Sequence, residues 1–162
     1  MAPRPVSVRV IALGSELAGD DAAALQVAAR LAPRAGVEVV LAGRPGPALI
    51  EHFEEGVPVV LLDVVRRGLS PGEVITLPLD TLVSRGLSSG SLTSHDLGPV
   101  DALRLGEALG RPAPRGLFVG IGGACFSPGP ALSAEVARGL SALEAALAAA
   151  IARLLHDEVD DA

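Results

Sequence analysis

The sequence predicts an α/β protein with three layers, in which helices cover both faces of a mostly parallel sheet of about five strands. Short apolar runs alternate along the chain with segments whose apolar residues recur at helical spacing, as in doubly wound sheets. The chain has 162 residues, of which 49% are hydrophobic, which is enough for one sizeable core and too little for two ordinary domains. Because only 2% of the residues are aromatic, Leu, Val, Ile and Ala must fill that core. We expect a single domain over residues 1–162.

Five short apolar runs predict the strands of this sheet. The predicted strands are Val8 to Leu13, Val37 to Leu41, Val57 to Leu62, Glu73 to Leu77 and Leu117 to Ile121. Asp63 directly follows the third run, so we expect it to end that strand at the carboxyl edge of the sheet. Pro78 stops the fourth run, which favours an edge strand there.

Helices are predicted between and after these strands. The predicted helices are Ala22 to Leu31, a short one through Leu49, Ile50 and Phe53, one opened by His95 and ending at Gly110, and a long C-terminal helix. Ser133 is positioned to cap the last of these helices, and the acidic residues 157–162 are expected to fray.

Composition excludes several classes of function. The formal net charge of −6 and the lack of a basic run argue against a nucleic-acid partner. The apolar stretch from Leu140 to Leu155 is interrupted by Glu144 and Arg153, so we expect it to pack on the sheet and not to cross a membrane. The N-terminal MAPRPVSVRV is too short and too interrupted for a signal peptide. A single cysteine, Cys125, permits no internal disulfide, and together these features predict a cytoplasmic protein.

Three side chains stand where an α/β sheet presents its ligands. Asp21 in GSELAGDD follows the first strand, Asp63 follows the third, and His95 lies in SLTSHDLG before a later helix. Because ligand sites of open parallel sheets lie at the carboxyl ends of the strands, these three residues can converge. Two carboxylates and one imidazole leave open positions on a divalent first-row metal such as Ni, Zn or Mn. Such a site polarises a carbonyl and activates water, as amide hydrolysis requires.

Each residue also has a plainer interpretation. Asp20 and Asp21 at the start of a helix are more often caps than ligands, and a lone histidine such as His95 is more often a surface residue. A lyase or a metal carrier would use the same three ligands. The combination of the three, and not any single residue, favours the metal site.

Four segments, read in order, resemble the hydrogenase maturation protease family. They are VRVIALGSELAGDDAAALQVAARL, VVLLDVVRRGLSPGEV, SLTSHDLGPVDALRLGEALG and VGIGGACFSPGPALSAEV, and the resemblance extends from about Val8 to Ala150. The resemblance implies a nickel-dependent endopeptidase that trims a C-terminal extension from the large-subunit precursor of a nickel-iron hydrogenase after nickel insertion. It further implies that Asp21, Asp63 and His95 contact the metal and carry catalysis, and that nickel arrives in the substrate. Zinc or another divalent ion can substitute for it.

One segment departs from the family pattern. Leu41-Ala42-Gly43-Arg44 stands where the family has a motif resembling Asp-Gly-Gly-Thr, so only Gly43 is kept and Arg44 adds a cation. The resemblance places Gly43 and Arg44 beside the site, where they would contact substrate. The departure supports an alternative function, a non-proteolytic accessory protein that binds a metalloprotein partner. A phosphate site at the Gly14 loop is a third, weaker hypothesis, because neighbouring acidic side chains would repel phosphate.

Overall fold

The computed structural model describes residues 5–85, 88–89 and 98–160. In this part of the chain one sheet has the strand order β2-β1-β3-β6-β4, with the short β5 paired to β3. The strands are β1 (Val8–Leu13), β2 (Val37–Gly43), β3 (Val59–Arg67), β4 (Val74–Pro78), β5 (Ser88–Ser89) and β6 (Gly116–Gly122). β1, β2, β3 and β6 are mutually parallel, whereas β4 runs antiparallel to β6 at the edge of the sheet. The predicted fold class is therefore confirmed.

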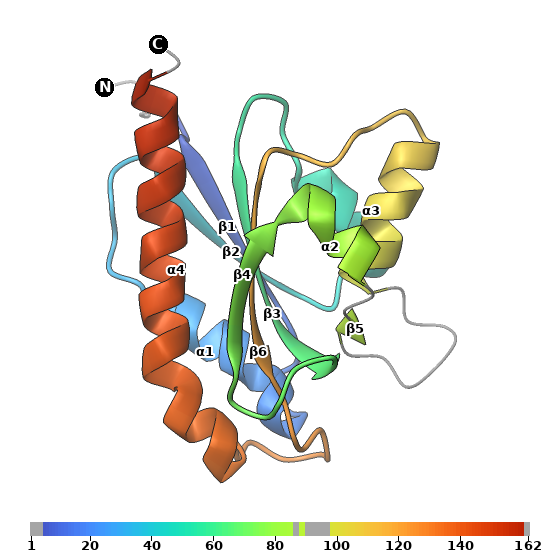
Figure 1. Cartoon of the computed structure of the whole chain (residues 1–162), viewed down its shortest axis with the longest axis vertical. Coiled ribbons are helices and arrows are strands. Elements are labelled where there is room, and N and C mark those ends of the chain that lie inside the picture. Colours follow the sequence, from blue (N-terminus) through green and yellow to red (C-terminus); the bar gives the residue numbers. More distant parts are fainter. Residues whose placement is uncertain (1–4, 86–87, 90–97, 161–162) are drawn as a thin grey trace.

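Helices cover both faces of the sheet, which gives three layers (Figure 1). The 3-10 turn η1 (Gly19–Ala22), α1 (Ala23–Ala29) and α4 (Ala134–Asp160) lie on one face. The 3-10 segment η2 (Gly46–His52), α2 (Leu79–Arg85) and α3 (Pro99–Ala108) lie on the other. The apolar residues accordingly form two buried clusters, one on each face of the sheet. β3 is buried from Val59 to Val65, as expected of a central strand covered on both sides.

Three local predictions were wrong, each for a physical reason. Asp63 does not end its strand, because β6 continues to pair with β3 as far as Val65. α2 (Leu79–Arg85) was not predicted, because its seven residues make only about two turns, too few for a clear helical period of apolar residues. α3 begins at Pro99, after Gly98 in extended conformation, because the residue before a proline is kept out of the helical region. His95, which was expected to open this helix, lies outside the described residues.

The C-terminal helix α4 begins where the sequence predicts. The hydroxyl of Ser133 accepts a hydrogen bond from the Val136 N–H at 3.3 Å, so Ser133 is the expected cap. The helix continues to Asp160, into the acidic tail. Among the described residues, one helical segment, Ala134–Asp157, is long and apolar enough to cross a membrane, and 33% of its most apolar window is buried. Its buried residues, which include Leu143 and Leu147, belong to the core against the sheet.

Candidate functional site

Asp63 lies in β3 at the point where the neighbouring strand β1 stops. Ala12 pairs with Leu62, and β1 ends one residue later, so β3 extends beyond it. Asp63 is only 4% exposed, and its Oδ1 accepts a hydrogen bond from the Val64 N–H at 2.8 Å. Asp63 is thus buried beside the carboxyl end of β1, as the sequence predicted. The carboxyl ends of the parallel strands lie at the lower end of the sheet in Figure 1.

Asp21 reaches the same end of the sheet through the loop that follows β1. It lies in η1, which contacts β3, and it is 3% exposed. Gly14 permits this path, because its φ is +132° and a Cβ there would lie 2.0 Å from the backbone oxygen of Asp21. The structure therefore brings two of the three predicted metal ligands to one end of the sheet.

Arg44 forms an ion pair with Asp21. Its Nε and Nη2 donate to Oδ2 of Asp21 at 3.0 Å and 2.6 Å. Gly43, with φ +68°, ends β2 immediately before Arg44, and its carbonyl accepts a hydrogen bond from the Gly14 N–H at 2.9 Å. Both predicted substrate-binding residues therefore lie beside Asp21, and Leu41, 48% exposed, lies on the same strand end. The sequence did not predict that Arg44 would bind the carboxylate itself.

Arg66 brings a second guanidinium to this end of the sheet, and sequence reasoning missed it. It lies in β3 at a bulge opposite β5, and bulges redirect side chains. Its guanidinium carbon lies 3.9 Å from the centre of the Phe126 ring, and its Nε is buried without a hydrogen-bond partner among the described residues. Burial lowers the pKa of Arg66, while attraction to Asp21 and Asp63 opposes that shift and repulsion by Arg44 adds to it. The charge of Arg66 therefore interacts with both carboxylates and with the guanidinium of Arg44.

Asp20 has a different partner from its neighbour Asp21. Its carboxylate accepts hydrogen bonds from the N–H groups of Ala124, Cys125 and Ser133, at 2.8, 2.8 and 2.6 Å, and from the Ser133 hydroxyl at 2.8 Å. Burial raises the pKa of Asp20, but these hydrogen bonds outweigh it and hold the pKa below its ordinary value. Asp20 caps neither η1 nor α1, contrary to the plainer interpretation of the acidic pair. It fixes the loop between β6 and α4.

The donor chemistry of this end of the sheet fits a divalent cation. Asp21 and Asp63 offer buried carboxylate oxygens, and Arg44 shows that a cation is attracted to Asp21. Within residues 5–85, 88–89 and 98–160, no three His, Cys, Asp or Glu side chains lie close enough together to hold a metal ion. The predicted third ligand, His95, lies outside those residues. Asp21 and Asp63 are the described residues that would hold a metal ion here.

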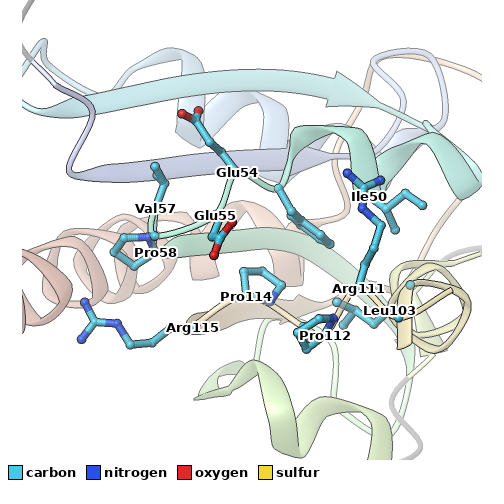
Figure 2. Close-up of a pocket in the computed structure, with 15 residues that line it drawn as sticks. Ile50, Glu54, Glu55, Val57, Pro58, Leu103, Arg111, Pro112, Pro114 and Arg115 are labelled. Carbon is cyan, nitrogen blue, oxygen red and sulfur yellow. The ribbon is translucent and has the colours of Figure 1, made fainter. Parts of the chain in front are cut away.

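A cavity of about 540 Å³ lies at the opposite end of the sheet. Figure 2 shows it between the segment before β3, with Glu55 and Pro58, and the segment before β6, with Arg111 and Pro112. The Arg9 N–H donates to the Pro58 carbonyl at the start of β1, which marks this as the amino end of the strands. Of the predicted site residues that the structure describes, Asp21, Gly43, Arg44 and Asp63, none lines the cavity.

The fold and the acidic site define a three-layer α/β protein whose paired carboxylates lie at the carboxyl end of a parallel sheet. A family model described as hydrogenase maturation protease matches residues 23–151, which is most of the chain. The chain therefore belongs to the hydrogenase maturation protease family, a family of endopeptidases. The matched region includes Asp63 and begins two residues after Asp21.

Solved structures of this family have the same fold. The hydrogenase maturation protease HybD from Thermococcus kodakarensis is 30% identical, with a TM-score of 0.66, over 88% of this chain and 98% of that one. The maturating endopeptidase HybD from E. coli is 18% identical, with a TM-score of 0.74, over 90% and 92% of the two chains. The protease HycI from Thermococcus kodakarensis is 22% identical, with a TM-score of 0.61, over 93% of each chain. No curated protein matches the sequence.

Proposed function

We propose that this protein is a nickel-dependent endopeptidase that removes the C-terminal extension of a nickel-iron hydrogenase large-subunit precursor after nickel insertion. The observation that carries the proposal is that two buried carboxylates, Asp21 and Asp63, lie at the same end of the sheet although they come from separate segments. Membership of the family and the names of its solved members support the class of substrate. We propose that it acts in the cytoplasm, which agrees with a sequence that has a single cysteine, Cys125, and therefore no internal disulfide.

In this proposal the substrate supplies the metal. Nickel held in the precursor would polarise the scissile carbonyl and acidify a water molecule, and zinc can replace it in that role. Asp21 and Asp63, with His95 as the proposed third ligand, would receive the ion and orient it toward the peptide bond. Water then adds to the carbonyl carbon, the C–N bond breaks, and the proton released from water passes to the departing amine. Gly43 and Arg44 would lie beside the bound peptide, since they adjoin Asp21.

The ion pair between Arg44 and Asp21 supports a second candidate function. It occupies an oxygen that a metal-binding site would use. A protein that binds the same metalloprotein partner without cutting it would tolerate that contact. We therefore retain a non-proteolytic accessory role as the alternative.

The intact mass of a nickel-loaded large-subunit precursor, before and after incubation with the protein, separates the two functions. We expect loss of one C-terminal peptide, and we expect the Asp63→Ala variant to reduce the rate by at least about a hundredfold, because removing a ligand of a catalytic metal costs that much or more. A nickel-free precursor is the control and should keep its mass. An unchanged mass together with a stable complex would establish the accessory role instead, and an unchanged mass without a complex would reject both functions.

A further inference from the structure

The charge balance at the carboxyl end of the sheet is unusual for a cation site. Two buried carboxylates, Asp21 and Asp63, share their surroundings with two guanidiniums, Arg44 and Arg66. A free divalent ion that approaches Asp21 therefore meets positive charge as well as negative. Coulomb repulsion between like charges at a few ångströms is strong wherever water is partly excluded.

The two arginines differ in how firmly they are held. Arg66 has its guanidinium against the Phe126 ring and its Nε buried, so packing fixes it. The Arg44 side chain is 48% exposed, and its described polar contacts both go to a single oxygen, Oδ2 of Asp21. Because Arg44 reaches Asp21 from the solvent side, it can leave without disturbing the core.

The base of the Arg44 side chain is fixed even though its tip is exposed. The Gly14 N–H donates to the Gly43 carbonyl at 2.9 Å, which ties the end of β2 to the loop that leads to Asp21. The fixed backbone therefore keeps the guanidinium within reach of Asp21. Charge-assisted hydrogen bonds of this kind are shorter and stronger than neutral ones.

We propose that Arg44 is a specificity-determining residue that holds Asp21 in the substrate-free protein and must be displaced by a metal ion, so that free ions are disfavoured relative to an ion presented by a bound substrate. This inference rests on the proposed function, because contacts elsewhere on a bound precursor would supply the free energy that a free ion lacks. Arg44 thereby makes metal recognition depend on the protein that carries the metal.

Calorimetric titration of the purified full chain with Ni²⁺ alone tests this role. We expect Arg44→Ala to bind Ni²⁺ at least about tenfold more tightly than the unaltered protein, because it removes the competing charge and leaves Asp21 and Asp63 in place. Arg34→Ala, which removes an exposed arginine from the turn before β2, is the matched control and should leave the affinity unchanged. Adding Asp21→Asn to Arg44→Ala should abolish the gain.

Arg44→Gln provides a second variant if the alanine variant does not fold, since glutamine keeps an N–H donor for Asp21 without the charge. Circular dichroism confirms folding in each case. An equal affinity for Ni²⁺ with and without Arg44, or no measurable binding by either folded variant, would overturn the proposal. Precursor cleavage is measured separately, so a gain in Ni²⁺ affinity without any cleavage would reject the proposed function while supporting the role of Arg44.

Discussion

Asp20 joins parts of the chain that are more than a hundred residues apart. Its carboxylate is fully buried and accepts three backbone N–H groups and one hydroxyl from residues 124–133. Each of those donors would lose its partner if the carboxylate were removed. The neighbouring Asp21 accepts hydrogen bonds from Arg44 instead, so the two adjacent acidic residues have different partners.

Replacing Asp20 by asparagine should destabilise the protein and change its response to acid. At pH 7 we expect a loss of roughly 3 kcal/mol, because an amide group cannot accept all four hydrogen bonds and buried donors remain unpaired. The pKa of Asp20 is below its ordinary value of 3.8 in the folded protein, so its contribution is present above about pH 4 and disappears as the pH falls through the folded pKa. Urea unfolding between pH 7 and pH 3 measures both effects.

The exposed Asp80, in the first turn of α2, provides the matched control. Asp80→Asn should change the free energy of unfolding by no more than about 0.5 kcal/mol. If Asp20→Asn lost stability on acidification as steeply as the unaltered protein, the hydrogen-bonded carboxylate would not be the source of that dependence.

Residue types and spacing predicted Asp21 and Asp63 at one end of the sheet, but not the partners of these side chains. The contacts of Asp20 to Cys125 and of Arg44 to Asp21 join segments that are far apart in sequence, and no local pattern specifies them. Arg66 was missed because the strand that carries it extends beyond the apolar run by which strands are recognised. His95 stays a prediction.

At the scale of elements, hydrophobic runs located the five main strands, and the observed strands differ from the predicted ones only in their first or last residues. β3 extends past its apolar run because the ladder to β6 continues to satisfy its backbone groups. The start of α3 was predicted too early, at His95, because the prediction did not take into account that the residue before Pro99 is kept out of the helical region. Apolar periodicity therefore predicts where an element lies, whereas hydrogen-bond partners and proline determine where it ends.

Helix α4 packs so closely on the turn before β4 that the helix needs a glycine, Gly139, and the turn needs another, Gly72. A Cβ at Gly139 would lie 2.7 Å from the Gly72 carbonyl oxygen and 2.9 Å from Cδ1 of Ile121. A Cβ at Gly72, which has φ +81°, would lie 2.5 Å from the Glu135 carbonyl oxygen. The helix and the turn are thus in backbone contact.

Gly139→Ala should destabilise the protein although alanine is the better helix former. The gain in helix propensity is about 1 kcal/mol, while forcing a methyl group against backbone that cannot yield costs about 1–3 kcal/mol. We expect a net loss of about 1 kcal/mol or more by thermal unfolding. Ser141→Ala, at an exposed position of the same helix, should be neutral or slightly stabilising. A Gly139→Ala protein more stable than the unaltered one would show that α4 does not pack this closely.

At the scale of the whole molecule, the sheet separates two ends with different chemistry. The carboxyl end carries the buried carboxylates, while the amino end carries the cavity before β3 and β6. The order of four motifs predicted the family and the fold together, because each motif belongs to a different strand end or loop of the same architecture. Which surface a large substrate contacts depends on the folded shape, and the motifs do not specify it.

Two exposed leucines allow the ends of the sheet to be compared directly. Leu17, 73% exposed, lies in the loop between β1 and η1, and its carbonyl accepts the Gly129 N–H at 2.8 Å beside the site. Leu109, 62% exposed, ends α3 next to the cavity at the amino end. We expect a precursor that presents its extension to Asp21 and Asp63 to cover the first leucine and not the second.

Leu17→Glu should therefore raise the KM for precursor cleavage by about tenfold with little change in kcat, because a charge placed in an apolar contact weakens binding without touching the reacting groups. Leu109→Glu adds the same charge to a similarly exposed leucine and should leave both constants within about twofold, since it lies at the far end of the sheet. Steady-state cleavage assays of the two variants, followed by intact mass, give these constants. Equal effects of the two substitutions would show that the precursor does not dock over the carboxyl end, and a larger effect of Leu109→Glu would place its binding surface at the cavity instead.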